Sequence, residues 1–175
     1  IVERPRENVS MAVLRASEIP IITPKDVAPS LDGFEVVGVF NAGVARYRDE
    51  VILLVRVAER PVQSNPDAVL TAFLEPSQGK IVTASFARSD PDNDFSDPRL
   101  IVRRNRRYLT SISHLRLARS DDGIHFTIDE HPAIAATEVY ESFGVEDPRI
   151  TQIDDVYYVA YVAVSPLGVT TALAS

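Results

Sequence analysis

The sequence predicts an all-β fold built from the blades of a propeller. Three observations support this prediction: short strand-like runs are frequent, helical periodicity is absent, and one strand–turn–strand unit occurs twice. Twelve prolines are scattered along the 175 residues, and no window shows a clean 3.6-residue apolar period. Many short strands without helices are typical of a sandwich, a barrel or a propeller. The internal repeat favours the propeller.

Runs rich in β-branched and aromatic residues are predicted as strands, and short polar turns separate them. Turns such as Asp121-Asp122-Gly123 and Asp154-Asp155 between apolar runs favour antiparallel hairpins. In chain order the predicted strands are Glu35–Phe40, Val44–Tyr47, Val51–Val57, Val69–Leu74, Lys80–Ala87, Leu109–Ser120, Ile124–Ile128, Arg149–Ile153, Val156–Val164 and Val169–Ala174.

The repeat joins two distant parts of the chain. Residues 38–58 read GVFNAGVARYRDEVILLVRVA, and residues 144–163 read GVEDPRITQIDDVYYVAYVA. Both units begin with Gly-Val and continue with a polar residue, Asn41 or Asp147, a strand, an acidic turn and an apolar strand. A repeated unit of this kind is predicted to be a propeller blade. Chance likeness between two hairpins is the alternative.

The length of the chain limits how many blades it holds. A blade takes roughly 40–50 residues, so the chain has room for about two. We expect a lead-in over residues 1–34 and blade-like units over 35–175, with an insertion near 61–107. Two blades cannot close a ring, so open sheet edges are expected. Residues 1–175 are therefore predicted to be a fragment of a larger ring, or to lack a partner segment.

Composition excludes several classes of partner. A net charge of -7 argues against binding to nucleic acid or to an anionic membrane. No apolar run approaches the ~18 residues of a membrane span. The first ten residues are polar and lack the apolar core of a signal peptide. The absence of cysteine excludes disulfides and thiolate metal sites, and it fits a cytoplasmic location. Assembly into a homo-oligomer is left open.

Three other groups of polar residues are alternative candidates for a binding site. The alternating aspartates of residues 90–94 have the spacing of a calcium loop, but Phe95 and Ile101 stand where the turn glycine and the bidentate glutamate belong. The basic run Arg103–Arg107 follows this acidic stretch, so we expect a hairpin with cross-strand ion pairs. The three histidines, His114, His125 and His131, lack the spacing of a zinc site. We expect His114 to be a strand histidine whose hydrogen bonds are satisfied. No metal site is therefore expected.

Residues 140–150, YESFGVEDPRI, form the segment most suggestive of chemistry. Two adjacent acids precede a proline, and an arginine then opens a strand. Pro148 biases Asp147 towards an extended conformation, which would direct its carboxylate into the channel lined by inner strands. The alternative is a turn with a local Glu146–Arg149 ion pair.

Four further segments complete a pattern: TPKDV at 23–27, GVFNAGV at 38–44, LLVR at 53–56 and SHLRLARSDDG at 113–123. In order and placement the chain resembles glycoside hydrolase family 130 over most of residues 18–175. Ala42 departs from the proline more common there, and residues 61–107 exceed the simplest family pattern, which indicates a subgroup. The resemblance implies a five-bladed propeller, of which this chain would be the N-terminal part, acting on β-mannosides.

The resemblance also implies roles for individual residues. Asp147 matches the family's catalytic acid, which in the phosphorylases passes its proton through a sugar hydroxyl. Asn41 and Arg56 match residues that hold the sugar in the cleaved subsite, although an end-of-strand salt bridge is the alternative for Arg56. The other substrate-binding candidates flank Asp147 in sequence: Tyr140, Glu141 and Arg149.

The expected function is inverting phosphorolysis of a β-mannoside oligosaccharide to α-mannose 1-phosphate. Inorganic phosphate would be the co-substrate, with no cofactor. An inverting hydrolase needs an acid and a base with water between them, whereas a phosphorylase needs one acid and cations that bind phosphate. In the family those cations come largely from later blades, beyond Ser175. Hydrolysis by a β-mannosidase and a non-catalytic sugar-binding propeller therefore stay open, as does the linkage.

Overall fold

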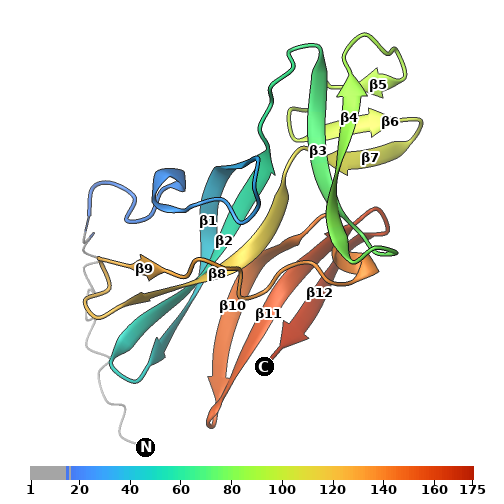
Figure 1. The fold of residues 1–175 in the computed structure, drawn as a ribbon. Coiled ribbons are helices and arrows are strands. Elements are labelled where there is room, and N and C mark those ends of the chain that lie inside the picture. The colour runs from blue at the N-terminus through green and yellow to red at the C-terminus, as the bar shows by residue number, and fades with distance from the viewer. Residues whose placement is uncertain (1–14, 16) are drawn as a thin grey trace, which may run out of the picture.

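The computed structural model describes residue 15 and residues 17–175, and this part of the chain is built almost wholly from β-strands (Figure 1). The all-β prediction is confirmed. The predicted lead-in lies partly outside the described residues, at 1–14 and 16. Its described remainder contains one 3-10 turn, η1 (Pro24–Asp26), and a second such turn, η2 (Val139–Glu141), precedes the C-terminal strands.

Two antiparallel sheets form the body of the structure. The first has the order β1-β2-β8-β9 and consists of β1 (Phe34–Tyr47), β2 (Glu50–Pro61), β8 (Ile112–Ser120) and β9 (Thr127–Ile128). The second has the order β10-β11-β12 and consists of β10 (Val145–Ile153), β11 (Val156–Ser165) and β12 (Gly168–Ala174). Each predicted strand overlaps a strand of the structure. Each sheet has open edges within the described residues, and closure into a five-bladed ring stays a prediction.

The chain between β2 and β8 forms two smaller sheets that extend away from the body (Figure 1). One is the hairpin β3 (Ala68–Glu75) and β4 (Lys80–Ala87); the other comprises β5 (Asn93–Asp94), β6 (Leu100–Arg103) and β7 (Arg106–Leu109). The predicted insertion at 61–107 falls within this segment. The hairpin returns to the body, where the Leu74 N–H donates to the Ser142 carbonyl at 2.8 Å.

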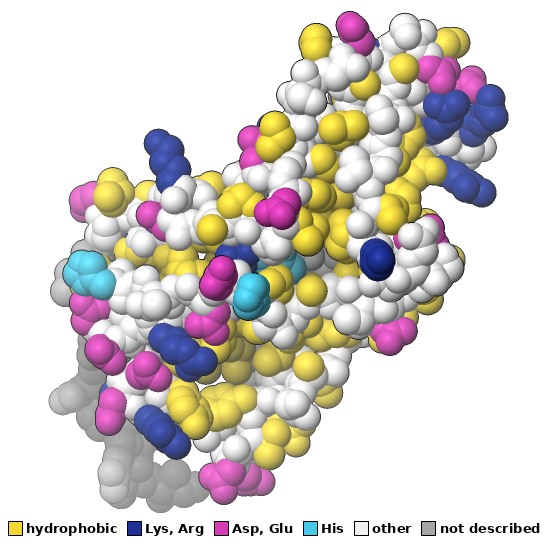
Figure 2. All heavy atoms as spheres, in the orientation of Figure 1, with side chains coloured by type: hydrophobic (Ala, Val, Ile, Leu, Met, Phe, Trp, Pro, Cys, Tyr) yellow, Lys and Arg dark blue, Asp and Glu magenta, His cyan; other side chains and the backbone are white. Residues whose placement is uncertain are grey.

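Two arginines of the basic run in the insertion pair with acids of the segment that precedes β5. Arg103 pairs with Asp90 and Arg104 with Asp92, both at 2.7 Å. Figure 2 shows blue and magenta side chains together at the outer end of the insertion. The predicted hairpin is formed by β6 and β7, but its ion pairs join it to the acidic segment before β5 and not one of its strands to the other. Two carboxylates of the calcium-like spacing are thus paired with arginines.

The two blade-like units share a backbone irregularity as well as a sequence pattern. The β1–β2 pairing shifts between Phe40 and Gly43, and the β10–β11 pairing shifts between Glu146 and Arg149. At the equivalent point of each bulge, one residue adopts left-handed backbone: Asn41 at φ 51° and Asp147 at φ 49°. Asn and Asp tolerate this conformation better than other non-glycine residues.

The expected extended conformation of Asp147 is therefore wrong. Pro148 disfavours the right-handed helical region for the residue before it, but it does not decide between extended and left-handed backbone. The ladder on either side of the bulge decides, because the extra residue must be accommodated between paired neighbours. The corresponding bulge in β1 lies between the two strands predicted within 35–47, and the structure continues through it as the single strand β1.

An apolar seam joins the two large sheets. Leu54, Leu115 and Val145 form its fully buried centre. Gly144 lets the backbones approach, because it has φ 108° and a Cβ there would lie 2.5 Å from the Ser113 carbonyl oxygen. Ser113 and Gly144 form an isolated parallel bridge at this point. The start of β10 is thereby fixed against β8, which places the segment around Asp147 beside the first sheet.

Candidate functional site

Arg56 is the centre of a polar cluster at this seam. In the sheet register it lies between Phe40 of β1 and Leu115 of β8. Its side chain is 16% exposed. The Nε donates to the Ser113 Oγ at 3.1 Å, and the guanidinium lies 4.5 Å from the centroid of the Phe40 ring. A cation over an aromatic face is attracted by the ring quadrupole, so the first sheet itself orients the guanidinium.

Asp147 meets the first sheet through one carboxylate oxygen. Its Oδ1 accepts hydrogen bonds from the Asn41 Nδ2 at 2.8 Å and from the Arg56 Nη1 at 2.9 Å. The side chain is 36% exposed, and no hydrogen bond from the described residues reaches its Oδ2. The structure therefore brings together three residues that the sequence predicted for one site, although Asn41 and Asp147 are separated by 106 positions.

Two opposing influences act on the pKa of Asp147. Burial alone would raise it, but hydrogen bonds from Asn41 and Arg56 and the nearby charge of Arg149 outweigh burial. The pKa of Asp147 is thus held below its usual value. This carboxyl group is therefore an ionised acceptor, and a ligand that took over its two donors would raise its pKa.

Glu146 completes the cluster, and the sequence analysis did not select it. Its carboxylate pairs with the Arg56 Nη2 at 2.6 Å, and its side chain is 18% exposed. Burial raises the pKa of Glu146, while the Arg56 charge opposes that rise. The local Glu146–Arg149 pair considered from the sequence is not formed; the Arg149 Nη1 instead donates to the Pro148 carbonyl at 2.8 Å. The signal that was available is the adjacency of the two acids before Pro148.

The other predicted residues take different places. Glu141 is 2% exposed. Its Oε2 accepts from the backbone N–H of Thr137 at 2.9 Å, and its Oε1 accepts from the Tyr161 hydroxyl at 2.9 Å. Burial and the Glu141 carboxylate raise the pKa of Tyr161 to about 12. Glu141 thus anchors the η2 turn in this structure, whereas Tyr140 is 41% exposed. Their predicted contacts with substrate stay predictions.

A second polar cluster lies on the opposite face of the first sheet. Glu59 and Arg116 are each 1% exposed and pair at 3.4 Å. The Ser30 N–H donates to the Glu59 Oε1 at 2.8 Å, and the Arg116 Nε donates to the His114 Nε2 at 3.1 Å. Burial, reinforced by the Arg116 charge, lowers the pKa of His114 to about 3. His114 is therefore the satisfied strand histidine that the sequence favoured.

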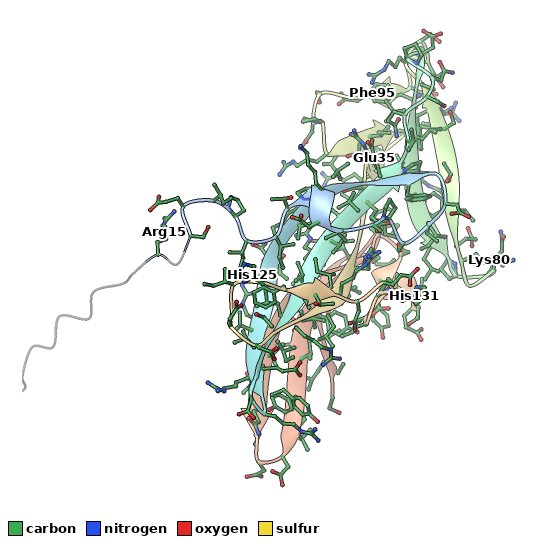
Figure 3. The ribbon with its side chains drawn as sticks, turned by 60° about the vertical axis from the view of Figure 1, so that its left-hand side comes forward. Arg15, Glu35, Lys80, Phe95, His125 and His131 are labelled. Carbon is green, nitrogen blue, oxygen red and sulfur yellow. The ribbon has the colours of Figure 1, made fainter. Side chains whose placement is uncertain are left out.

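Metal-binding groups are not assembled in the described part of the chain. Residues 15 and 17–175 contain no group of three or more His, Cys, Asp or Glu side chains that could hold a metal ion. Figure 3 shows His125 and His131 apart from each other, and the His125 Nδ1 lies 2.7 Å from the Asp122 carboxylate. Across the same residues, no helix is long and apolar enough to cross a membrane.

The seam between the two bulged sheets thus holds a partly exposed carboxylate between an amide and a guanidinium. Residues 95–175 match a family model described as β-1,4-mannooligosaccharide phosphorylase. A β-1,2-mannobiose phosphorylase of Listeria innocua is 47% identical over 167 residues, which is 93% of this chain and 47% of that protein. The chain belongs to glycoside hydrolase family 130, as its motifs predicted.

Further relatives agree with this assignment. A β-1,2-mannobiose phosphorylase of Thermoanaerobacter sp. (strain X514) is 44% identical over 50 residues, 29% of this chain and 17% of that protein. The solved structure of the Listeria innocua enzyme, in complex with β-1,2-mannobiose, matches with a TM-score of 0.81 and 47% identity. That match covers 87% of this chain and 44% of the solved one. The chain thus spans about half the length of its Listeria relative, 47%.

Proposed function

We propose that the full-length protein is an inverting β-mannoside phosphorylase that releases α-mannose 1-phosphate. The observation that supports this most directly is the convergence of Asn41 and Arg56 on the Asp147 carboxylate. The family resemblance assigns sugar binding to the first two and proton donation to the third. The 47% identity to a β-1,2-mannobiose phosphorylase supports phosphate as the attacking group, and it favours the β-1,2 linkage.

The proposed reaction balances with one acid. A phosphate oxygen attacks the anomeric carbon from the face opposite the glycosidic oxygen, and the carbon–oxygen bond to the leaving sugar breaks. The departing oxygen takes a proton that originates on Asp147, relayed through a sugar hydroxyl. Inversion converts the β bond into an α bond to phosphate. Asp147 ends as a carboxylate, which Asn41 and Arg56 stabilise in the geometry observed here.

The proposal also covers the protein as a whole. We propose a single five-bladed propeller domain, with residues 1–34 as lead-in, 35–175 as its first blades and 61–107 as an insertion. The cations for phosphate are placed on later blades. A cytoplasmic location, where inorganic phosphate is available, fits this activity, and self-association into a homo-oligomer is compatible with it.

The test uses the full-length enzyme with β-1,2-mannobiose and, separately, β-1,4-mannobiose, each with and without phosphate. Phosphorus NMR should show α-mannose 1-phosphate from β-1,2-mannobiose only when phosphate is present. Release of free mannose at the same rate in both buffers would show that the enzyme is a hydrolase and not a phosphorylase. Binding without turnover of either disaccharide would instead indicate a sugar-binding module.

A further inference from the structure

All three nitrogens of the Arg56 guanidinium have separate partners. The Nε donates to the Ser113 Oγ at 3.1 Å. The Nη1 donates to Asp147 at 2.9 Å and the Nη2 to Glu146 at 2.6 Å. One cation thus serves two adjacent carboxylates, and each carboxylate meets a different edge of the guanidinium. The fork of an arginine permits this division, which the point charge of a lysine does not.

The two carboxylates are not equivalent in position. Glu146 is 18% exposed, and among the described side chains it pairs with Arg56 only, whereas Asp147 is 36% exposed and accepts from both Arg56 and Asn41 at its Oδ1. Burial raises the pKa of Glu146, and the Arg56 charge opposes that rise, so the pairing with Arg56 favours the ionised form of Glu146. Asp147 is the more exposed of the two acids and is the one that a ligand can reach.

We propose that Glu146 is a positioning residue that keeps Arg56 as its own ion-pair partner, so that Asp147 is free to take up and release the catalytic proton. This inference rests on the proposed function and adds a residue to it. When the sugar takes over the donors of Asn41 and Arg56, Asp147 loses the hydrogen bonds that stabilise its charge. Arg56 stays neutralised by Glu146, so Asp147 need not remain ionised to balance it.

The groups that face Asp147 determine the direction of the effect. They are Asn41 from β1, Arg56 from β2, and Glu146 and Arg149 from its own strand. Glu146 supplies the only negative charge of this set. Replacing it with a neutral amide removes a like charge and leaves Arg56 with Asp147 as its one carboxylate. Both changes favour the ionised form of Asp147, so its pKa should fall.

The first experiment compares Glu146→Gln with Ser113→Ala in the full-length enzyme. The basic limb of the kcat–pH profile reports the acid in the enzyme–substrate complex. In Glu146→Gln this limb should move to lower pH by about one unit, which lowers kcat on the limb by about tenfold, while KM changes by less than about threefold. Ser113→Ala removes an anchor of Arg56 without changing charge, so it should raise KM and leave the limb in place.

The second measurement does not depend on turnover. Carbon NMR of the enzyme labelled at the aspartate carboxyl carbon, with the Asp147→Asn variant to assign the signal, follows the titration of Asp147 directly. In the wild type, addition of mannose should raise the pKa of Asp147. In Glu146→Gln the pKa of Asp147 without mannose should be lower than in the wild type, and mannose should raise it by less. Glu146→Asp keeps the charge and should recover much of the wild-type titration.

The outcomes separate this inference from the proposed function. If the wild type proves to be a hydrolase, or shows no turnover, the titration of Asp147 still tests Glu146. The inference is overturned if Glu146→Gln leaves both the limb and the titration unchanged while raising KM. It is equally overturned if the limb moves to higher pH, because Glu146 would then not be the partner that frees Asp147.

Discussion

Asp147→Asn is the substitution that separates chemistry from folding most cleanly. Asparagine is among the few residues that accept the left-handed backbone of this position, φ 49°. Its Oδ1 can still accept the hydrogen bonds that now come from Asn41 and Arg56 at 2.8 and 2.9 Å. Arg56 keeps its pairing with Glu146 at 2.6 Å. The geometry of the cluster should therefore survive, and only the ionisable proton is lost.

The magnitudes follow from this geometry. The lost charge interaction involves a side chain that is 36% exposed, so the free energy of unfolding should change by less than about 1 kcal/mol. Loss of a general acid should lower kcat by at least ~10²-fold, which corresponds to about 2.7 kcal/mol of transition-state stabilisation. The effect on activity should thus clearly exceed the effect on stability.

The assay measures phosphate-dependent turnover of β-1,2-mannobiose and thermal unfolding of the same full-length preparations. Asp154→Asn is the matched control, because Asp154 also has left-handed backbone, φ 53°, at the turn between β10 and β11. The control should alter neither quantity. A loss of turnover below tenfold in Asp147→Asn, or a loss that parallels a large fall in unfolding temperature, would refute the assignment of Asp147 as the acid.

Three further predictions concern the cations and the buried cluster. Arg56→Lys should raise KM for the mannoside about tenfold or more, since the single nitrogen of an ammonium cannot reproduce the planar, three-nitrogen fork that meets the three partners, while turnover should still require phosphate. Glu59→Gln should lower the free energy of unfolding by about 3 kcal/mol, because Arg116 is left buried without its counter-ion. Glu35→Gln, which breaks the exposed pair of Glu35 with Arg60, should cost less than about 1 kcal/mol. The pKa of His114 is about 3 in the folded chain and ~6.5 when unfolded; protonation therefore favours unfolding, and stability should fall as pH drops below ~6.5 towards 3. Urea titrations at several pH values should show a flatter dependence in His114→Gln.

Much of the fold was predictable because it depends on local signals. Alternating β-branched residues and acidic turns located the strands, and the repeat located the two bulged hairpins β1–β2 and β10–β11. The strands of the insertion were harder: β5 and β6 have two and four residues, too few for periodicity to be read. Their pairing is recognisable only through the charges of Asp90 and Arg103, which the sequence analysis did use.

The sequence predicted which residues form most of the site, but not how their side chains are arranged. Family motifs selected Asn41, Arg56 and Asp147, yet nothing local indicates that these three side chains meet across the seam between two sheets. Glu146 was missed because its partner, Arg56, lies in the other large sheet, and local reasoning supplied Arg149 instead. The backbone of Asp147 was predicted incorrectly because the rule for residues before proline ignores the constraint of a bulge.

The paired bulges have a consequence for how such a protein can change. The position occupied by Asn41 in one unit and Asp147 in the other accepts few residue types, chiefly Asn, Asp and Gly. Asparagine and aspartate codons differ by one nucleotide, so a duplicated unit can exchange a neutral donor for a proton-bearing acid in a single mutational step without rebuilding its backbone. New activities on this scaffold could therefore arise by altering which repeat holds the acid, while the strands around it stay as they are.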